Sequence, residues 1–155
     1  MKGQEHRIVQ SKSVHFGKPV IKGTRVTVSA LVGAVASGDP LEQVAEDYGV
    51  TVDDVRSALL FALDRIEEIV TALRIKPVSE VAKEFGVKQT KKVLNLSLGR
   101  DSELRRLLEV IRREGIEEAR KRFGSGALRG VLQVAADLCD EPKLETASSQ
   151  ITVGW

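Results

Sequence analysis

Cysteine, histidine and aromatic residues are scarce in this sequence. The 155 residues include one cysteine, Cys139, and two histidines, and aromatic side chains make up 4% of the chain. One cysteine excludes an internal disulfide, and these three residues cannot supply the cysteine and histidine pairs of a zinc finger. We therefore expect no metal and no other cofactor. The apolar residues are mainly Leu, Val, Ala and Ile, a composition that favours packed helices over a strand-rich sandwich.

Long hydrophobic runs are also missing. No stretch approaches the ~18 uncharged residues of a membrane helix, and the first six residues lead into no apolar run. The sequence therefore predicts a cytoplasmic protein without a membrane partner, associated with the nucleoid if it binds DNA. Abundant Lys, Arg and Glu with a single asparagine, Asn95, is a composition typical of thermostable proteins.

Charge is sorted into blocks along the chain, although the net charge is only +2. Residues 1–26 carry a net charge of +5, residues 27–75 carry −6, residues 76–135 carry +6 and the last twenty carry −3. Two basic segments therefore flank an acidic one. This pattern indicates both a polyanion and a protein as partners, and the simpler alternative is that solvated helix faces differ in sign.

A repeated pattern runs along the chain. Residues 41–50 and 78–87 match without a gap at an offset of 37, and residues 116–124 form a weaker third copy. Each copy has apolar first and fourth positions, an aromatic eighth position and then a glycine, which predicts a short helix closed by a tight turn. A second helix follows each turn, as in a helix-turn-helix. Three copies at one period favour tandem DNA-binding units over the alternative, αα-hairpins of an ordinary bundle.

The predicted fold is all-α, with tandem helix-turn-helix units behind a short N-terminal β-hairpin or β-ribbon. The β-branched runs between residues 6 and 28 are separated by turn signals, so this segment should be extended. The expected division is 1–75 with the first unit, 76–139 with the second and third units, and a flexible tail at 140–155. We expect helices over 29–37, 52–73, 78–85, 88–97, 102–114, 116–123 and 127–139.

Two helix starts in the first unit carry capping signals. Thr51 is expected to cap the helix that begins at residue 52, because a threonine side chain there can accept a hydrogen bond from the first turn. Asp39 and Glu42 are expected to form a capping box around Pro40, which suits the first helical position.

The second helix of a helix-turn-helix enters the DNA major groove with its N-terminal residues toward the base edges. In the first unit this helix begins with Asp53 and Asp54, whose carboxylates would repel phosphates. The second unit offers lysines for phosphates and amides for base edges, so we expect it to contact double-stranded DNA. Its expected contacts are Lys88, Gln89, Thr90, Lys91, Lys92 and Asn95.

Other cations are expected to support this binding through the DNA backbone. The β-ribbon would clamp phosphate or reach into a groove, and the alternative is an exposed turn made soluble by its lysines. The supporting residues are Lys18, Lys22 and Arg25 on the ribbon and Arg120, Lys121, Arg122 and Arg129 in the third unit.

The helix at 52–73 carries a long apolar stripe, at positions 55, 59, 62, 63, 66, 69, 70 and 73. Such a stripe suits a core or a partner helix. The carboxylates at the start of its second helix disfavour DNA binding by the first unit. Its acidic face and this stripe are therefore expected to be free to form a homodimer or to hold a basic partner.

Signals for catalysis are weak. The run from Gly17 to Thr24 lacks the residue order of a phosphate-binding loop. Neighbouring carboxylates such as Glu117 and Glu118 point to different helix faces and indicate solvated surface. Cys139 is interpreted as a small apolar residue. Because no nucleophile, base and orienting group can be assembled, we expect no enzymatic activity.

The run from Phe16 to Val28, followed by a helix, Gly38 and residues 41–63, closely resembles the domain-of-unknown-function family 433. Every position of its Gly-Lys/Arg-Pro-x-Ile-x-Gly-Thr-Arg-x-x-Val hallmark is present in order. The resemblance implies a homeodomain-like helical unit with a small β-element, often dimeric. It also implies an antitoxin partnered with a PIN-like nuclease toxin, or a related transcriptional regulator. Residues that the resemblance makes structural or DNA-facing are Gly17, Pro19, Gly23, Thr24 and Arg25.

Three functions therefore remain open at this stage. The leading one is a sequence-specific double-stranded DNA-binding protein, a transcriptional regulator or DNA-repeat binder. Residues 76–139, which have no counterpart in the minimal family domain, would then extend its footprint. The alternative is an antitoxin whose tail, Glu141 to Trp155, wraps a nuclease toxin. A helical adaptor that binds only protein is the third.

Overall fold

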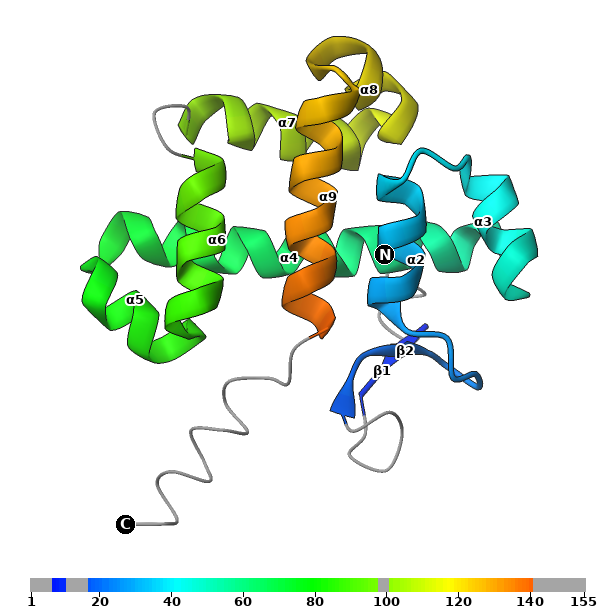
Figure 1. Ribbon diagram of the computed structural model, residues 1–155, viewed down its shortest axis with the longest axis horizontal. Coiled ribbons are helices and arrows are strands. Elements are labelled where there is room, and N and C mark those ends of the chain that lie inside the picture. Colours follow the sequence, from blue (N-terminus) through cyan, green and yellow to red (C-terminus); the bar gives the residue numbers. More distant parts are fainter. Residues whose placement is uncertain (1–6, 11–16, 98–100, 141–155) are drawn as a thin grey trace.

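The computed structural model describes residues 7–10, 17–97 and 101–140, and the prediction of an all-α fold with a short β-ribbon is confirmed (Figure 1). Within these ranges none of the helices is long and apolar enough to cross a membrane. The strands are β1 (Ile8–Val9) and β2 (Val20–Ile21). The helices are α2 (Val28–Ala36), α3 (Leu41–Tyr48), α4 (Val52–Ile75), α5 (Val78–Phe85), α6 (Val87–Ser97), α7 (Asp101–Glu114), α8 (Ile116–Phe123) and α9 (Ser125–Asp140).

The β-ribbon positions the start of α2. β1 and β2 pair antiparallel, with Ile8 opposite Ile21. The backbone then turns, and the N–H of Val28 donates to the carbonyl of Pro19 at 2.9 Å. Thr27 caps α2 by accepting a hydrogen bond from the N–H of Ala30 at 3.2 Å. The extended segment thus ends in a helix cap, which fixes where α2 begins.

The turn after β2 explains the Gly-Thr pair of the sequence motif. The N–H of Thr24 donates to the carbonyl of Ile21 at 3.0 Å, which closes a β-turn. Gly23 occupies its third position with a φ of 79°, where glycine carries no steric cost. The Thr24 hydroxyl donates to the same carbonyl at 2.9 Å and accepts from the N–H of Val26 at 3.0 Å. These residues therefore shape the turn.

The two capping predictions have different outcomes. Thr51 caps α4 as predicted, in a full capping box with Asp54. The predicted box at Asp39 and Glu42 is wrong, because the cap position of α3 is Pro40 and no side chain hydrogen-bonds there. The extended conformation of Pro40 starts the helix one residue later than the sequence suggested.

The three repeats are each a helix, a glycine with positive φ and a second helix, but the turns differ in length. In the first unit Gly49 is left-handed, and three residues separate α3 from α4. In the second and third units a single glycine, Gly86 or Gly124, separates the helices. The carbonyl of Gly86 already accepts from the N–H of Thr90, and that of Gly124 from Leu128. DNA-binding helix-turn-helix motifs use turns of about three to four residues, which only the first of these units matches.

Helix α9 packs against both α2 and α4, so the core includes the last repeat (Figure 1). The buried residues form one cluster that extends from Ile21 to Cys139. The apolar stripe of α4 lies in this cluster, with Val55, Leu63 and Ile66 fully buried. Helices of the same chain therefore cover the stripe, which serves the core, and a homodimer through it stays a prediction.

Replacing Leu132 with alanine is expected to lower the free energy of unfolding by about 2–5 kcal/mol. Leu132 lies on α9 and is 0% exposed, so the substitution leaves a cavity in the core. Urea denaturation followed by circular dichroism measures the loss. Val87→Ala, at a position 60% exposed, is the control and should change stability little. Equal stability of Leu132→Ala and the wild type would contradict the central position of α9.

Candidate functional site

The cations of the β-ribbon divide into two groups. Lys22 and Arg25 flank the turn after β2 and are exposed. Lys18 lies before β2, and its Nζ is 3.1 Å from Oδ1 of Asp140, the last residue of α9. The Ser29 hydroxyl donates to the same oxygen at 3.3 Å. Lys18 therefore ties the ribbon to α9, and Lys22 and Arg25 face solvent.

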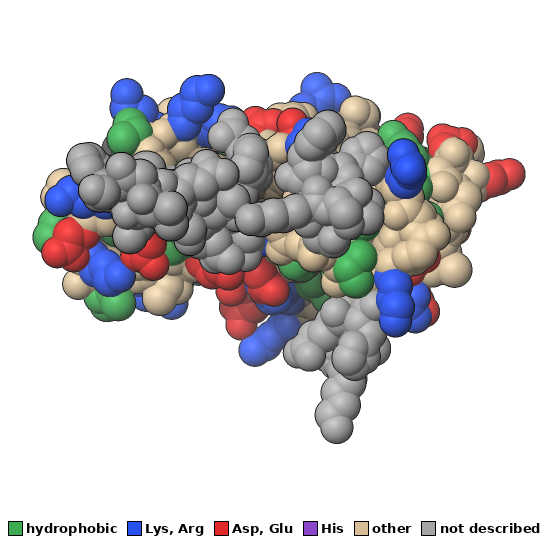
Figure 2. All heavy atoms as spheres, turned by 90° about the horizontal axis from the view of Figure 1, so that it is seen from below, with side chains coloured by type: hydrophobic (Ala, Val, Ile, Leu, Met, Phe, Trp, Pro, Cys, Tyr) green, Lys and Arg blue, Asp and Glu red, His purple; other side chains and the backbone are tan. Residues whose placement is uncertain are grey.

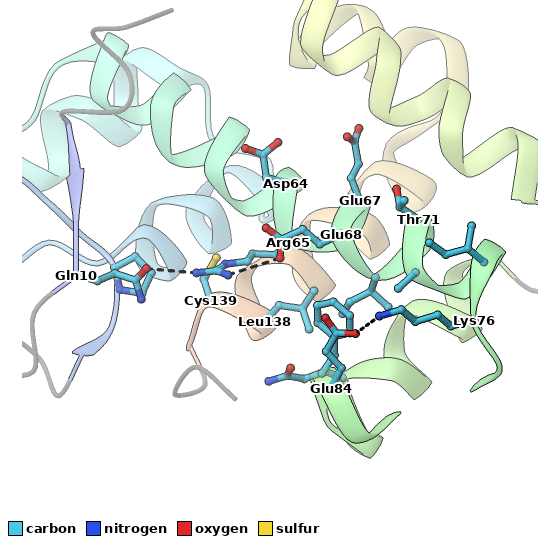
Figure 3. A pocket seen from close by; sticks show the side chains of 16 residues that line it. Gln10, Asp64, Arg65, Glu67, Glu68, Thr71, Lys76, Glu84, Leu138 and Cys139 are labelled. Carbon is cyan, nitrogen blue, oxygen red and sulfur yellow. Dashed lines mark hydrogen bonds and ion pairs between the residues drawn. The ribbon is translucent and has the colours of Figure 1, made fainter. Parts of the chain in front are cut away.

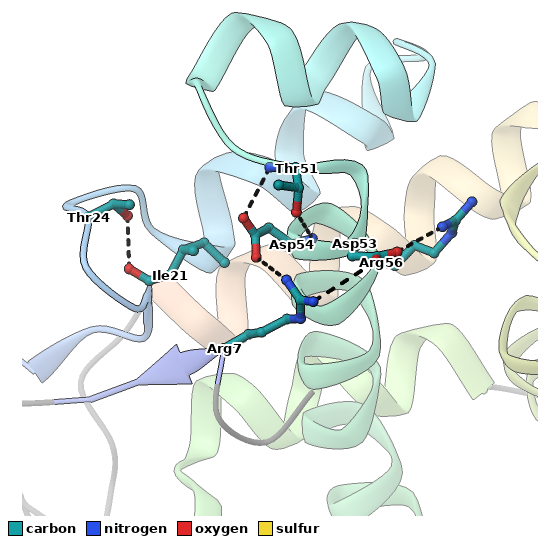
Figure 4. A network of polar contacts seen from close by, with 7 residues as sticks. All are labelled: Arg7, Ile21, Thr24, Thr51, Asp53, Asp54 and Arg56. Atoms are coloured by element: carbon teal, nitrogen blue, oxygen red, sulfur yellow. Dashed lines mark hydrogen bonds and ion pairs between the residues drawn. The ribbon is translucent and has the colours of Figure 1, made fainter. Parts of the chain in front are cut away.

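Arg7, the residue before β1, pairs with the acidic start of α4 (Figure 4). Nη1 of Arg7 donates to Oδ1 of Asp54 at 2.9 Å, and its Nη2 is 3.9 Å from Asp53. Arg56 approaches Asp53 from the other side at 3.1 Å. Two carboxylates and two guanidinium groups thus balance at this helix start. The expected repulsion of phosphate by Asp53 and Asp54 is correspondingly weaker than the sequence indicated.

The pKa of Asp54 is held below its usual value. Burial alone would raise the pKa of this carboxyl group, but its hydrogen bonds outweigh that effect. The backbone N–H of Thr51 donates to Oδ2 at 3.0 Å, and Arg7 donates to Oδ1. Sequence reasoning missed Arg7, since a basic residue so far along the chain from Asp54 gives no local signal of contact.

Three of the predicted DNA contacts on α6 share one exposed face. Lys88, Lys91 and Asn95 are all exposed, and their spacing of three and four residues places them along one side of the helix. Two lysines and an amide therefore form a polar stripe, which we call the α6 stripe. Lysine supplies phosphate contacts and asparagine can read the edge of adenine.

The other three predicted contacts on α6 face inward or sideways. Thr90 is 1% exposed, so the prediction that it contacts DNA is wrong. The Thr90 side chain faces helix α5, and its hydroxyl lies 3.5 Å from the carbonyl oxygen of Val81. Lys92 is half-buried and pairs with Asp137 of α9 at 3.5 Å. Gln89 lines a groove beside α5.

The predicted cations of the third unit are engaged in local pairs. Arg120 bonds Glu117 at 2.9 Å. Arg122 bonds Glu118 at 3.0 Å and Glu114 at 2.8 Å. Arg129 donates to the carbonyl of Ala36 at 3.4 Å, at the end of α2. Lys121 is exposed. Much of this charge is balanced within α7 and α8, which weakens its attraction for phosphate.

The predicted contacts do not form one surface. Helix α6, which carries the α6 stripe, lies toward one end of the long axis, and the β-ribbon and α3 lie toward the other end (Figure 1). Helix α8 occupies a third side, above α9 in the same view. A duplex that touches the α6 stripe is therefore not expected to reach all predicted cations.

Helix α3 presents an acidic surface. Glu42, Glu46 and Asp47 are exposed on α3, and Asp39 precedes it. The sequence of α3 contains no Lys or Arg. Acidic side chains gather at the end of the molecule over α3 (Figure 2). We call these four residues the α3 acidic face. It adjoins the exposed Tyr48, a residue type that is enriched at protein interfaces.

An open groove of about 790 Å³ lies between α4, α5 and the end of α9 (Figure 3). Apolar side chains line it, including Ile69, Ile75, Phe85 and Leu138. Charged groups stand around them, but they are paired with one another. The pairs are Arg65 with Glu68, Lys76 with Glu84 at 2.9 Å, and Arg112 with both Asp64 and Glu67.

Cys139 lies at the inner edge of this groove without being a reactive thiol. Burial raises its pKa to about 12, although the nearby Arg65 guanidinium acts in the opposite direction. The thiol is therefore protonated at neutral pH, as sequence reasoning expected for a small apolar residue. Across the described ranges, no group of three His, Cys, Asp or Glu side chains is placed to hold a metal ion.

Comparison with known proteins relates the first third of the chain to one family. Residues 8–62 match the family described as "Protein of unknown function (DUF433)". This match agrees with the resemblance of the Gly-Lys-Pro to Gly-Thr-Arg run. The matched segment contains both strands, α2, α3 and the first part of α4.

The chain is also similar to a Mycobacterium tuberculosis protein named "Putative antitoxin VapB45". It is 43% identical over 44 residues, which is 28% of this chain. The matched part spans 18% of the length of the mycobacterial protein. No solved structure matches the chain.

Replacing Asp54 with asparagine is expected to lower stability at neutral pH and to have a smaller effect in acid. The folded-state pKa of Asp54 is lowered, so its stabilisation is present above the unfolded pKa of ~3.9 and is lost as pH falls through the folded value. Urea denaturation at pH 7 and pH 3 measures the difference.

Asp53→Asn is the matched control, because the Asp53 side chain is 66% exposed and lies outside the capping box. It should lower stability less at pH 7. A gap between wild type and Asp54→Asn that stays constant from pH 7 to pH 3 would show that the charge of Asp54 does not stabilise the fold.

Proposed function

We propose that this protein is the antitoxin of a toxin–antitoxin pair and neutralises a nuclease toxin by binding it. The observation that carries the proposal is the 43% identity to a protein named as an antitoxin, over 44 residues. The family match covers residues 8–62, which build the β-ribbon, α2, α3 and the start of α4. The toxin is therefore expected to contact this end of the molecule.

The α3 acidic face is the proposed contact. A nuclease holds a polyanionic substrate, so its substrate-binding surface carries positive charge. Glu42, Glu46 and Asp47 are exposed, and no cation on α3 offsets them. Complementary charge speeds association and selects the partner. An acidic helix placed over the basic surface of a nuclease would also exclude its substrate.

Reversing the charge of this face is expected to weaken toxin binding. The double substitution Glu42→Lys and Glu46→Lys places like charges against the basic toxin. We expect the affinity to fall at least tenfold, which corresponds to a loss of about 1.4 kcal/mol of binding free energy. Titration calorimetry with the nuclease toxin measures the affinity, and a nuclease assay measures neutralisation.

The control is Glu109→Lys with Glu117→Lys, which changes the net charge equally on α7 and α8. It should bind the toxin nearly as the wild type does. If both double variants lose affinity equally, the toxin responds to net charge and not to α3. If the wild type neither binds nor inhibits the nuclease, the antitoxin proposal is wrong.

Binding of double-stranded DNA is a second proposed function, favoured by the α6 stripe. Lys88 and Asn95 are separated by about 10 Å along the helix, which fits within a major groove about 12 Å wide. Lys91 lies between them on the same exposed face. The protein would then bind its DNA site with sequence preference through Asn95 and would regulate transcription. Lys22 and Arg25 are exposed and would serve a separate backbone contact.

Removing the two lysines of the α6 stripe is expected to weaken DNA binding and its salt dependence. Each phosphate contact contributes a slope of about −0.9 to the logarithm of affinity against the logarithm of salt concentration. Lys88→Ala with Lys91→Ala should therefore make the slope shallower by about 1.8. Fluorescence anisotropy with a mixed pool of duplexes at several salt concentrations measures this change.

Arg105→Ala with Arg113→Ala removes the same charge from exposed positions of α7 and is the control. An equal change of slope in both variants would show that only net charge matters. Failure of the wild type to bind any duplex would support the adaptor hypothesis, in which the protein contacts protein alone.

A further inference from the structure

The two ends of the molecule carry charge of opposite sign. Helix α3 lies at one end of the long axis, and α5 lies at the other with α6 beside it (Figure 1). Residues 39–48 contain four carboxylates and no Lys or Arg, a net charge of −4. Residues 76–97 contain five lysines and two glutamates, a net charge of +3. The acidic and basic blocks of the sequence therefore stay apart in the fold.

Exposed apolar side chains lie at the same two ends. Tyr48, the last residue of α3, is 39% exposed and adjoins the α3 acidic face. At the other end Ile75 is 74% exposed and Val87 is 60% exposed. Val87 precedes Lys88 on α6 and lies one turn before Lys91, so it borders the α6 stripe. A protein interface combines apolar side chains with a polar rim, and each end supplies both.

We call the α3 acidic face with Tyr48 the acidic end, and Val87, Lys88 and Lys91 the basic end. These two ends cannot meet within one chain. Helix α4 runs between them, and its 24 residues rise about 36 Å. The Debye length is about 8 Å at physiological ionic strength, so neither end neutralises the other. Another copy of the chain, however, can bring the opposite charge into direct contact.

The sign of the charges also determines which ends can meet. A contact between two acidic ends, or between two basic ends, would place like charges against each other, which is unfavourable. A contact between an acidic end and a basic end pairs opposite charges and brings Tyr48 near Val87. Such a contact joins two different surfaces, so it is heterologous and can repeat from copy to copy.

We propose that copies of this protein associate head to tail, with the acidic end of one copy against the basic end of the next. The carboxylates of α3 then face Lys88 and Lys91, and Tyr48 and Val87 supply the apolar part of the contact. This inference goes beyond the proposed function and does not depend on it, because neither toxin nor DNA takes part. Association would cover, in the free protein, both surfaces proposed for those partners.

Sedimentation of the purified full-length chain at low salt tests the proposal. The mean mass of the wild type should rise above 16.9 kDa, the mass of one chain, as the protein concentration increases. One variant makes both ends basic, by Glu42→Lys, Glu46→Lys and Asp47→Lys. The other makes both ends acidic, by Lys88→Glu and Lys91→Glu. Each variant alone should keep the mass of one chain, and their equimolar mixture should associate again, because opposite ends then meet.

The matched controls reverse the same number of charges at exposed positions of α7 and α8. They are Glu103→Lys with Glu109→Lys and Glu117→Lys, and Arg105→Glu with Arg113→Glu. Both should associate as the wild type does, and circular dichroism checks that every variant is folded.

Three results would overturn the proposal. The first is a wild-type mass that stays at 16.9 kDa at every protein concentration. The second is association that persists in either end variant alone, because the contact would then lie elsewhere. The third is a mixture of the two end variants that fails to associate although the wild type does. Since toxin and DNA are absent, failure of the antitoxin proposal would leave all of these results unchanged.

Discussion

The burial of one face of α4 under α2 and α9 is the constraint on which the rest of the structure depends. Val55, Leu63 and Ile66 are fully buried, and α9 adds Leu128 and Leu132 to the same cluster. The apolar stripe of α4 is buried inside the chain and therefore serves the core. The surfaces that the described helices leave outside this core include the α3 acidic face, the α6 stripe and the groove.

These surfaces differ in charge because their charged groups have different partners. At the start of α4, Arg7 and Arg56 balance Asp53 and Asp54. On α3, in contrast, the exposed carboxylates have no basic residue in their helix. An unbalanced field acts over a distance of about a Debye length, whereas paired charges cancel. The α3 acidic face is thus better suited than the start of α4 to attract a macromolecular partner of opposite charge.

The sequence predicted the helices well because each begins or ends at a local signal. Glycines close α3, α5 and α8, and Thr51 starts α4 at the predicted residue. Contacts between distant residues could not be predicted in this way. A threonine at position 90 has the same local pattern whether it faces solvent or Val81, and nothing near Asp54 indicates Arg7. Such choices are made by packing, which brings together residues far apart in the chain.

The repeats show how packing assigns different roles to similar sequences. The second helix of the third copy, α9, is buried through Leu128, Val131 and Leu132, so it serves the core. In the second copy, α6 buries Thr90 and Val93 and leaves the α6 stripe in solvent. In the first copy, α4 contributes a buried apolar stripe to the core and also exposes a charged N-terminal turn. A shared helix-glycine-helix pattern therefore predicts the local fold of each copy, and the number of neighbours around its second helix determines which surface remains for binding.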